Sequence, residues 1–193
     1  MLTFESDSHT YRFAGEEIPS VTQLLKCLRN FDWVTPEQLA AAGERGTDVD
    51  AACTLDDMND LVEDSVSPQI MPFLEGWRKF KRDCKPEIVE IQLPLYHPVF
   101  RYAGTLDRVL ILNGALTLLD IKTGVQSKVT GLQLAGYKLA WDVMRPGTPI
   151  QRAVALHLTK RGDYKIVHYD DISCQRTFIA LVTLHQWSKE NSI

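Results

Sequence analysis

Apolar and polar residues recur with two different periods along the chain. In the first half, apolar positions recur every three or four residues, most clearly over 69–83, where aromatic and leucine side chains share one face. From residue 88 onward, short apolar runs separated by turn residues are typical of strands. The pattern predicts helices over 21–29, 36–42, 44–63, 69–83, 130–141 and 172–187, and strands over 2–5, 10–13, 88–97, 102–112, 115–123, 152–158 and 164–169.

This order of elements predicts a mixed α/β fold. A length of 193 residues fits one domain, in which a mainly helical N-terminal part (1–86) precedes an α/β core (87–193). No internal repeat or low-complexity linker divides the chain.

The core contains one strong hairpin signal, Asn113-Gly114, between two apolar runs. A two-residue turn there pairs Leu112 with Ala115, and counting back along both strands places Asp107 directly opposite Asp120. Directly opposed residues have Cβ atoms ~4.5–5.5 Å apart, and like charges at that distance destabilise a sheet. A strand bulge would shift this register by one residue.

Lys122 follows Asp120 by two residues, so it shares the same strand face. One interpretation is that the lysine neutralises a half-exposed pair of acids. The other is a divalent-metal site, because Mg²⁺ and Mn²⁺ prefer oxygen ligands and a metal removes the repulsion. In that case Lys122 would orient a water molecule or neutralise charge on a phosphoryl group.

Composition narrows the class of protein. Hydrophobic residues make up 45% and charged residues 24%, as in globular chains that bury a core without disulfides. A net charge of −4 argues against nucleic-acid binding through a uniformly basic surface, so DNA contact requires local basic patches or acidic groups that hold metal. The chain has neither an apolar run of ~20 residues nor a signal-peptide pattern, so we expect no membrane partner and a cytoplasmic location.

Three motifs in order, GTLD (104–107), DIK (120–122) and QLAGY (133–137), resemble the PD-(D/E)XK nuclease superfamily. The resemblance is closest to RecB-like exonucleases of the kind that phages often encode, and PSVT (19–22) and RGTDVD (45–50) extend it. It implies a restriction-endonuclease-like core, with a central mixed sheet flanked by helices. For a phage-encoded protein it implies the cytoplasm of the bacterial host.

The resemblance also assigns roles to individual residues. The catalytic residues that it implies are Asp107, Asp120, Lys122, Gln133 and Tyr137. One or two Mg²⁺ or Mn²⁺ ions would be held by Asp107, Asp120 and the backbone carbonyl of Ile121. Gln133 and Tyr137, four residues apart on one helix face, would orient the lysine, the attacking water or the DNA backbone. A helix-surface pair is the alternative for these two residues.

Two features depart from the family pattern. Related nucleases often carry R-G-x-x-x-H, and here Asp50 stands at the histidine position, as a further metal ligand or as one more acid in an acidic helix. Some relatives hold an iron–sulfur cluster with clustered cysteines, and the four cysteines here are too widely spaced, so we expect none. Glu90, on the strand before the hairpin, is a further candidate ligand, although a solvated position fits equally well.

Several residues are candidates for contact with DNA. They are Arg45, Thr47, Ser20, Thr22, Lys128 and Lys138. Five bases between 75 and 85 form either a track for a DNA backbone or a solvated helix face, and eight acids lie between 44 and 64.

The sequence therefore predicts a metal-dependent DNA nuclease, most simply an exonuclease in DNA recombination, replication or repair, with DNA and a recombination or replication protein as partners. A structure-specific endonuclease with the same site is the first alternative. The second is a nuclease-fold protein that binds DNA or a partner with weakened catalysis.

Overall fold

The computed structural model describes residues 2–5, 10–28 and 35–192. Its strands are β1 (Leu2–Glu5), β2 (Thr10–Phe13), β3 (Glu16–Ile18), β4 (Glu87–His97), β5 (Tyr102–Leu112), β6 (Ala115–Lys122), β7 (Arg152–Leu158) and β8 (Tyr164–His168). Its α-helices are α1 (Val21–Leu24), α2 (Pro36–Asp57), α3 (Met71–Cys84), α4 (Val129–Met144) and α5 (Ile172–Glu190), with 3₁₀ turns at Lys26–Leu28 and Glu63–Ser65. None of the described helices is long and apolar enough to cross a bilayer.

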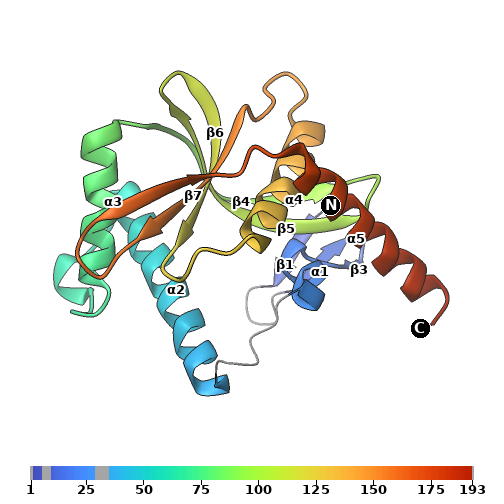
Figure 1. Cartoon of the computed structure of the whole chain (residues 1–193), viewed down its shortest axis with the longest axis horizontal. Coiled ribbons are helices and arrows are strands. Elements are labelled where there is room, and N and C mark those ends of the chain that lie inside the picture. The colour runs from blue at the N-terminus through green and yellow to red at the C-terminus, as the bar shows by residue number, and fades with distance from the viewer. Residues whose placement is uncertain (1, 6–9, 29–34, 193) are drawn as a thin grey trace.

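The core is a five-stranded sheet in the order β4-β5-β6-β7-β8 (Figure 1). All neighbours are antiparallel except β6 and β7, which are parallel and are joined through α4. A parallel pair needs such a crossover, because a tight turn reverses the chain direction. The predicted fold class, a mixed sheet flanked by helices, is confirmed.

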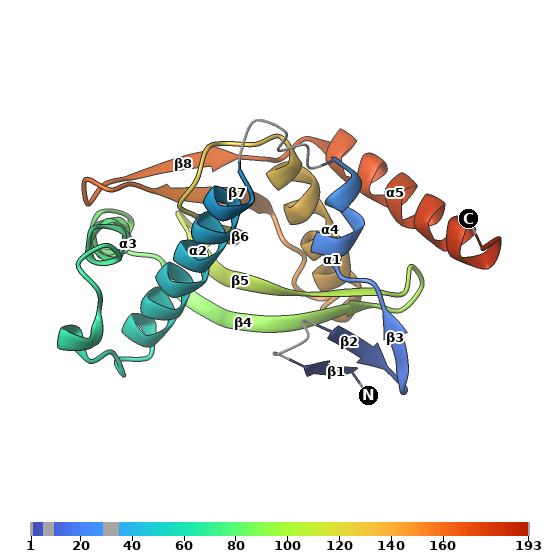
Figure 2. The same ribbon diagram turned by 90° about the horizontal axis from the view of Figure 1, so that it is seen from below.

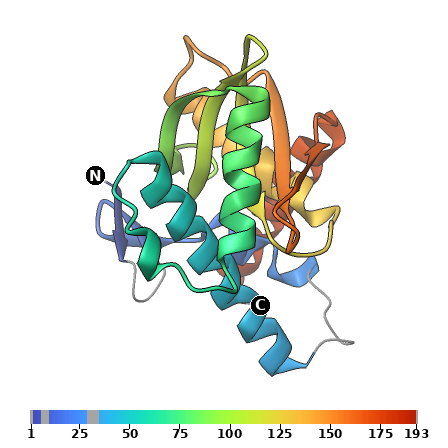
Figure 3. The ribbon, with the colours of Figure 1, turned by 90° about the vertical axis from the view of Figure 1, so that its left-hand side faces the viewer.

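Helices cover the two faces of this sheet with separate apolar clusters. Residues of α1, α4 and α5 form one cluster, with Leu134, Trp141 and Phe178 fully or almost fully buried. Residues of α2 and α3 form the other, around Trp77 and Phe80. Figure 2 shows the two groups of helices on either side of the sheet, and Figure 3 shows α2 and α3 from their outer side.

A second, three-stranded sheet (β1-β2-β3) packs against the end of β4 and β5. Tyr11 shares a hydrogen bond of 2.8 Å with Thr105, and the ring of Phe13 stacks on Tyr96 at 4.0 Å between centroids. The predicted strands 2–5 and 10–13 are confirmed, whereas β3 has no counterpart in the sequence prediction. The predicted turn over 6–9 lies outside the described residues.

Two helix predictions were wrong. The segments 36–42 and 44–63 form a single helix, α2, which ends at Asp57. Gly43 and Gly46 do not end the helix, because each glycine costs only ~1 kcal/mol in a helix interior. The helix predicted over 21–29 stops at Leu24 and continues as a 3₁₀ turn. Its last residue and the break predicted at 30–33 lie outside the described residues.

The basic and acidic runs pair with each other between α3 and the end of α2. Arg78 contacts Asp56 at 2.7 Å and Glu63 at 2.8 Å, and Lys81 contacts Asp56 at 2.7 Å and Asp57 at 2.8 Å. Arg78 and Lys81 therefore fit neither alternative given for the basic run, a DNA-binding track or a solvated helix face. Their charges instead hold α3 against the end of α2.

Candidate active site

The hairpin register follows the prediction over five residue pairs. The pairs run from Leu112–Ala115 to Arg108–Leu119, with Asn113 and Gly114 both at positive φ (50° and 74°), as a tight turn of this type requires. Beyond the last pair, Oδ2 of Asp107 accepts a hydrogen bond of 2.8 Å from the backbone N–H of Ile121. The Asp107 carboxylate is thereby fastened to the strand that carries Asp120.

A chain of polar contacts leads from Asp120 to α4. Nζ of Lys122 lies 2.6 Å from Oδ2 of Asp120 and donates to Oε1 of Gln133 at 3.3 Å. Nε2 of Gln133 in turn donates to the hydroxyl of Tyr137 at 3.2 Å. The structure therefore brings together the five predicted catalytic residues, from the middle of β5, the end of β6 and the first half of α4.

Gly104 makes room for this arrangement. A Cβ atom on Gly104 would lie 2.6 Å from Cε1 of Tyr137 and 3.3 Å from Cγ2 of Val21, far too close for the ring. The glycine of the GTLD motif thus lets the Tyr137 ring pass directly over β5. Tyr137 is buried (4% exposed), and this burial is the main cause of the raised pKa of its hydroxyl, so the hydroxyl stays protonated at neutral pH.

Burial and neighbouring negative charges raise the pKa values of two carboxylates in the site, Asp107 and Asp50. Burial, followed by the charges of Asp120 and Asp50, raises the pKa of Asp107 to about 8, against the opposing effects of Lys122 and of the Ile121 N–H. Burial also raises the pKa of Asp50, which the Arg108 guanidinium counteracts. Three carboxyl groups are therefore gathered in a poorly solvated place, where Asp107 favours its protonated form.

Such a site fits a divalent cation in its donor chemistry. Asp120 is 1% exposed, and its Oδ1 has no hydrogen-bond partner among the described residues, which is costly for a buried acceptor. No three or more His, Cys, Asp or Glu side chains in the described ranges are grouped closely enough to hold a metal by themselves. Mg²⁺ often binds proteins through only one or two carboxylates and keeps several waters, so the two carboxylates of Asp107 and Asp120 match the donor number that it ordinarily takes.

Asp50 and Glu90, the other predicted ligands, have protein partners. Oδ2 of Asp50 accepts from Nε2 of Gln92 at 2.5 Å, and its Oδ1 lies 3.6 Å from Nη1 of Arg108. Glu90 forms an ion pair of 3.1 Å with Arg145, at the end of α4. Asp50 is near enough to affect the pKa of Asp107, whereas Glu90 is tied to a different helix end.

Three of the residues predicted to contact DNA, Ser20, Thr22 and Thr47, have hydrogen-bond partners within the protein. Ser20 caps α1, with Oγ accepting from the Gln23 N–H at 3.1 Å and sharing a hydrogen bond of 3.0 Å with Thr22. Thr47 donates to the Gly43 carbonyl at 3.2 Å within α2. Arg45, on the same helix, has a buried Nε without a hydrogen-bond partner in the described part of the chain.

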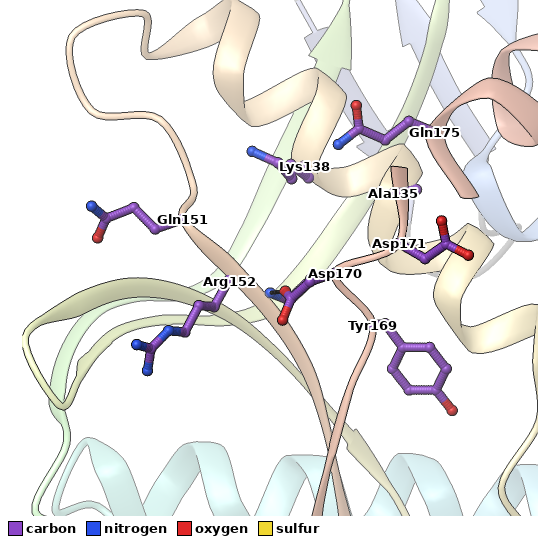
Figure 4. A pocket seen from close by; sticks show the side chains of 9 residues that line it. Ala135, Lys138, Gln151, Arg152, Tyr169, Asp170, Asp171 and Gln175 are labelled. Carbon is purple, nitrogen blue, oxygen red and sulfur yellow. Dashed lines mark hydrogen bonds between the residues drawn. The ribbon is translucent and has the colours of Figure 1, made fainter. Parts of the chain in front are cut away.

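The two predicted lysines lie in different hollows. Lys128 is exposed directly before α4 and lines a groove of about 650 Å³ together with Val129, His168 and Tyr169. Lys138 lines a cavity of about 60 Å³ beside Arg152 (Figure 4), and its Nζ contacts Asp142 at 2.7 Å and the Ile150 carbonyl at 2.5 Å. Lys128 is therefore the lysine with a free path to a ligand beside the β6–α4 loop.

Sequence reasoning missed Arg108 and Gln92. Arg108 is fully buried, and its guanidinium binds Asp57, Thr54 and the Asp107 carbonyl. A signal was present, because strand alternation places Arg108 on the same face as Leu110, where a charge requires a buried partner. Gln92 gives no such signal, since its role depends on the conformation of its backbone.

Comparison with known proteins places the fold. No protein-family model matches the chain, and no curated protein matches its sequence. Among solved structures it is similar to a crystal structure from Eubacterium rectale named "Putative exonuclease", with a TM-score of 0.52 and 14% identity, over 75% of this chain and 64% of that one. It also aligns with SSO0001, with a TM-score of 0.38 and 14% identity over 72% of each chain.

The chain thus spans 64% of the length of the Eubacterium rectale protein. At 14% identity the likeness shows a shared, nuclease-like fold. Because one fold hosts many functions, the function has to come from the chemistry of the site.

Proposed function

We propose that this chain is a metal-dependent DNA nuclease that hydrolyses phosphodiester bonds, and that it acts as an exonuclease. The observation that carries the proposal is the placement of Lys122 between Asp120 and Gln133, beside the Asp107 carboxylate that is fastened to Ile121. A lysine beside paired carboxylates can bind a phosphate group, whose charge the carboxylates alone would repel.

Each side chain then has a defined task. Lys122 places a positive charge where negative charge develops on the phosphate, and Asp120 and Gln133 hold its ammonium group in position. Tyr137 fixes the amide of Gln133 through their 3.2 Å contact. When bound at Asp107, Asp120 and the Ile121 carbonyl, Mg²⁺ or Mn²⁺ would supply Lewis-acid activation of water and neutralisation of the phosphate.

A route for the DNA follows from the bases near this point. Lys128 lies exposed directly before α4, close in sequence to Lys122, and lines the groove with Tyr169. A lysine can bind phosphate, and an aromatic ring offers a surface on which a base stacks. Arg45, on α2, carries a further positive charge, and we propose that its guanidinium group contacts the backbone of the substrate. We place the activity in DNA recombination, replication or repair, alongside a partner protein of that machinery.

The experiment compares three DNA substrates: linear duplex, linear single strand and closed circle. Each is incubated with Mg²⁺, Mn²⁺ or EDTA, using the wild type and the variants Lys122→Ala and Lys160→Ala. Lys160 is an exposed lysine in the β7–β8 turn, so its replacement controls for the loss of one positive charge. The proposal predicts metal-dependent loss of linear DNA by the wild type and the control, and none by Lys122→Ala.

Cutting of closed circles would replace the exonuclease by an endonuclease that uses the same site. Binding of DNA without cleavage under any metal condition would contradict the proposal and leave a DNA-binding protein with a nuclease fold.

A further inference from the structure

Gln92 has an unusual backbone conformation in the middle of β4. Its φ is +50°, in the left-handed region that a glycine enters freely and that other residues seldom occupy. Its neighbours in β4 pair with β5 through Ile91–Arg108 and Leu93–Leu106, after a shift of register between Ile88 and Glu90. The interrupted position therefore lies opposite Asp107, at the candidate active site.

The conformation directs the side chain toward α2. Nε2 of Gln92 donates to Oδ2 of Asp50 at 2.5 Å, across 42 residues of sequence. On the other side of the same carboxylate, Nη1 of Arg108 lies 3.6 Å from Oδ1. Asp50 is thus held between a neutral amide donor and a fully buried guanidinium.

This contact fixes a third carboxylate near the two at the hairpin. Nη1 of Arg108, which lies 3.6 Å from Asp50, also donates to the backbone carbonyl of Asp107 at 2.8 Å, so one guanidinium nitrogen lies close to both acids. Oδ1 of Asp50 is buried and has no hydrogen-bond partner among the described residues, and the Arg108 guanidinium lies 3.6 Å from it. A left-handed backbone at a residue other than glycine costs free energy of folding, and such strain is concentrated at functional sites. Gln92 combines this strain with a position opposite Asp107 and a hydrogen bond to Asp50.

We propose that Gln92 is a positioning residue, whose left-handed backbone and side-chain amide hold Asp50 toward the Asp107–Asp120 pair for metal and substrate binding. This inference rests on the proposed nuclease function. The strained backbone of Gln92 then serves the candidate active site, and not only the shape of β4.

A pair of variants separates the amide from the backbone. Gln92→Gly and Gln92→Ala both remove the donor, but only glycine relieves the left-handed strain. We expect both to cleave DNA about tenfold more slowly or worse, and to need a higher Mn²⁺ concentration for half-saturation in calorimetry without DNA. We expect Gln92→Gly to melt roughly 2–4 °C above Gln92→Ala, because its backbone is unstrained.

If Gln92→Gly cleaved DNA and bound Mn²⁺ as well as the wild type does, the inference would be overturned. Gln92 would then affect only the backbone conformation of β4. A second test uses the Asp50→Ala background, where Gln92→Gly is expected to cause no further loss of cleavage or of Mn²⁺ affinity. An additional loss there equal to that in the wild type would show that Gln92 does not act through Asp50.

Different results would contradict the proposed nuclease function and the positioning role of Gln92. A wild-type chain that neither cleaves DNA nor binds Mn²⁺ would contradict the proposed function, and the inference with it. A wild type that does both, while Gln92→Gly is indistinguishable from it, would contradict the inference alone.

Discussion

Arg108 and Asp57 form an ion pair in which neither side chain is exposed, with Nε 2.9 Å from Oδ2. The pair joins β5 to the last turn of α2, directly behind Asp107. Trp77 completes it, because its Nε1 donates to Oδ1 of Asp57 at 2.9 Å. A buried polar network of Arg108, Asp57 and Trp77 therefore lies next to the candidate active site and connects the sheet to α2 and α3.

Removing the acid of this pair should be strongly destabilising. Asp57→Ala removes the nearer counter-ion of the buried Arg108 guanidinium and leaves only the Asp50 carboxylate, 3.6 Å away, so we expect a loss of about 3–5 kcal/mol in the free energy of unfolding. Urea unfolding at neutral pH measures it, with Asp60→Ala as the control, because Asp60 is an exposed acid three residues away. A loss as small as the control's, within about 0.5 kcal/mol of wild type, would mean that the pair contributes little.

Gly104 should tolerate no side chain without an effect on the site. Gly104→Ala places a Cβ atom 2.6 Å from Cε1 of Tyr137, so the ring has to move away from Gln133. We expect a loss of about 1–3 kcal/mol in stability together with slower cleavage. Gly147→Ala is the control, since a Cβ there meets nothing. Unchanged cleavage by Gly104→Ala would show that the position of Tyr137 does not matter for catalysis.

The raised pKa of Asp107 predicts how stability depends on pH without metal. The folded chain holds this proton up to a pH of about 8, whereas an unfolded aspartate loses it near pH 3.8. The folded state thus binds more protons in between, and stability falls as the pH rises through that window, by at most ~1.4 kcal/mol per pH unit. Urea unfolding in EDTA from pH 5.5 to 8.5 should show this decline, and Asp107→Asn should reduce it. An identical slope in the variant would refute the assignment to Asp107.

Replacing Lys128 and replacing Lys79 should have different effects on how the affinity for DNA depends on salt. Lys128→Ala should weaken DNA binding and reduce the salt slope of the affinity by about 0.7–0.9, as expected for one lost phosphate contact. Lys79→Ala removes the same charge from α3, where Lys79 pairs with Asp83 at 2.7 Å, and should leave the slope unchanged. Fluorescence anisotropy with single-stranded DNA in Ca²⁺ measures both. The reverse ranking would place the DNA along α3 instead.

Local signals in the sequence predicted the hairpin that carries Asp107 and Asp120. Asn113-Gly114 strongly favours a two-residue hairpin, and this turn determines the register of β5 against β6 and hence the neighbourhood of Asp107 and Asp120. The strand and helix order of the core followed from periodicity alone. Both kinds of signal depend on residues close together along the chain, which is why they could be read without a structure.

The contacts that support the site could not be predicted in this way. Arg108 finds Asp57 across 51 residues, and Gln92 finds Asp50 across 42, so their pairing depends on how α2 packs on the sheet. The pairing of α3 bases with α2 acids is tertiary for the same reason. The positive φ of Gln92 is invisible in the sequence, because a glutamine gives no sign of a left-handed backbone.

The most direct test of the central claim is the cleavage of linear DNA in Mg²⁺ or Mn²⁺ by Lys122→Met beside the wild type. Methionine keeps most of the length of the lysine side chain and removes only its charge, so folding and DNA binding should persist. The account predicts metal-dependent cleavage by the wild type and a loss of at least ~100-fold in the variant. Equal cleavage by both proteins, or none by the well-folded wild type, would contradict it.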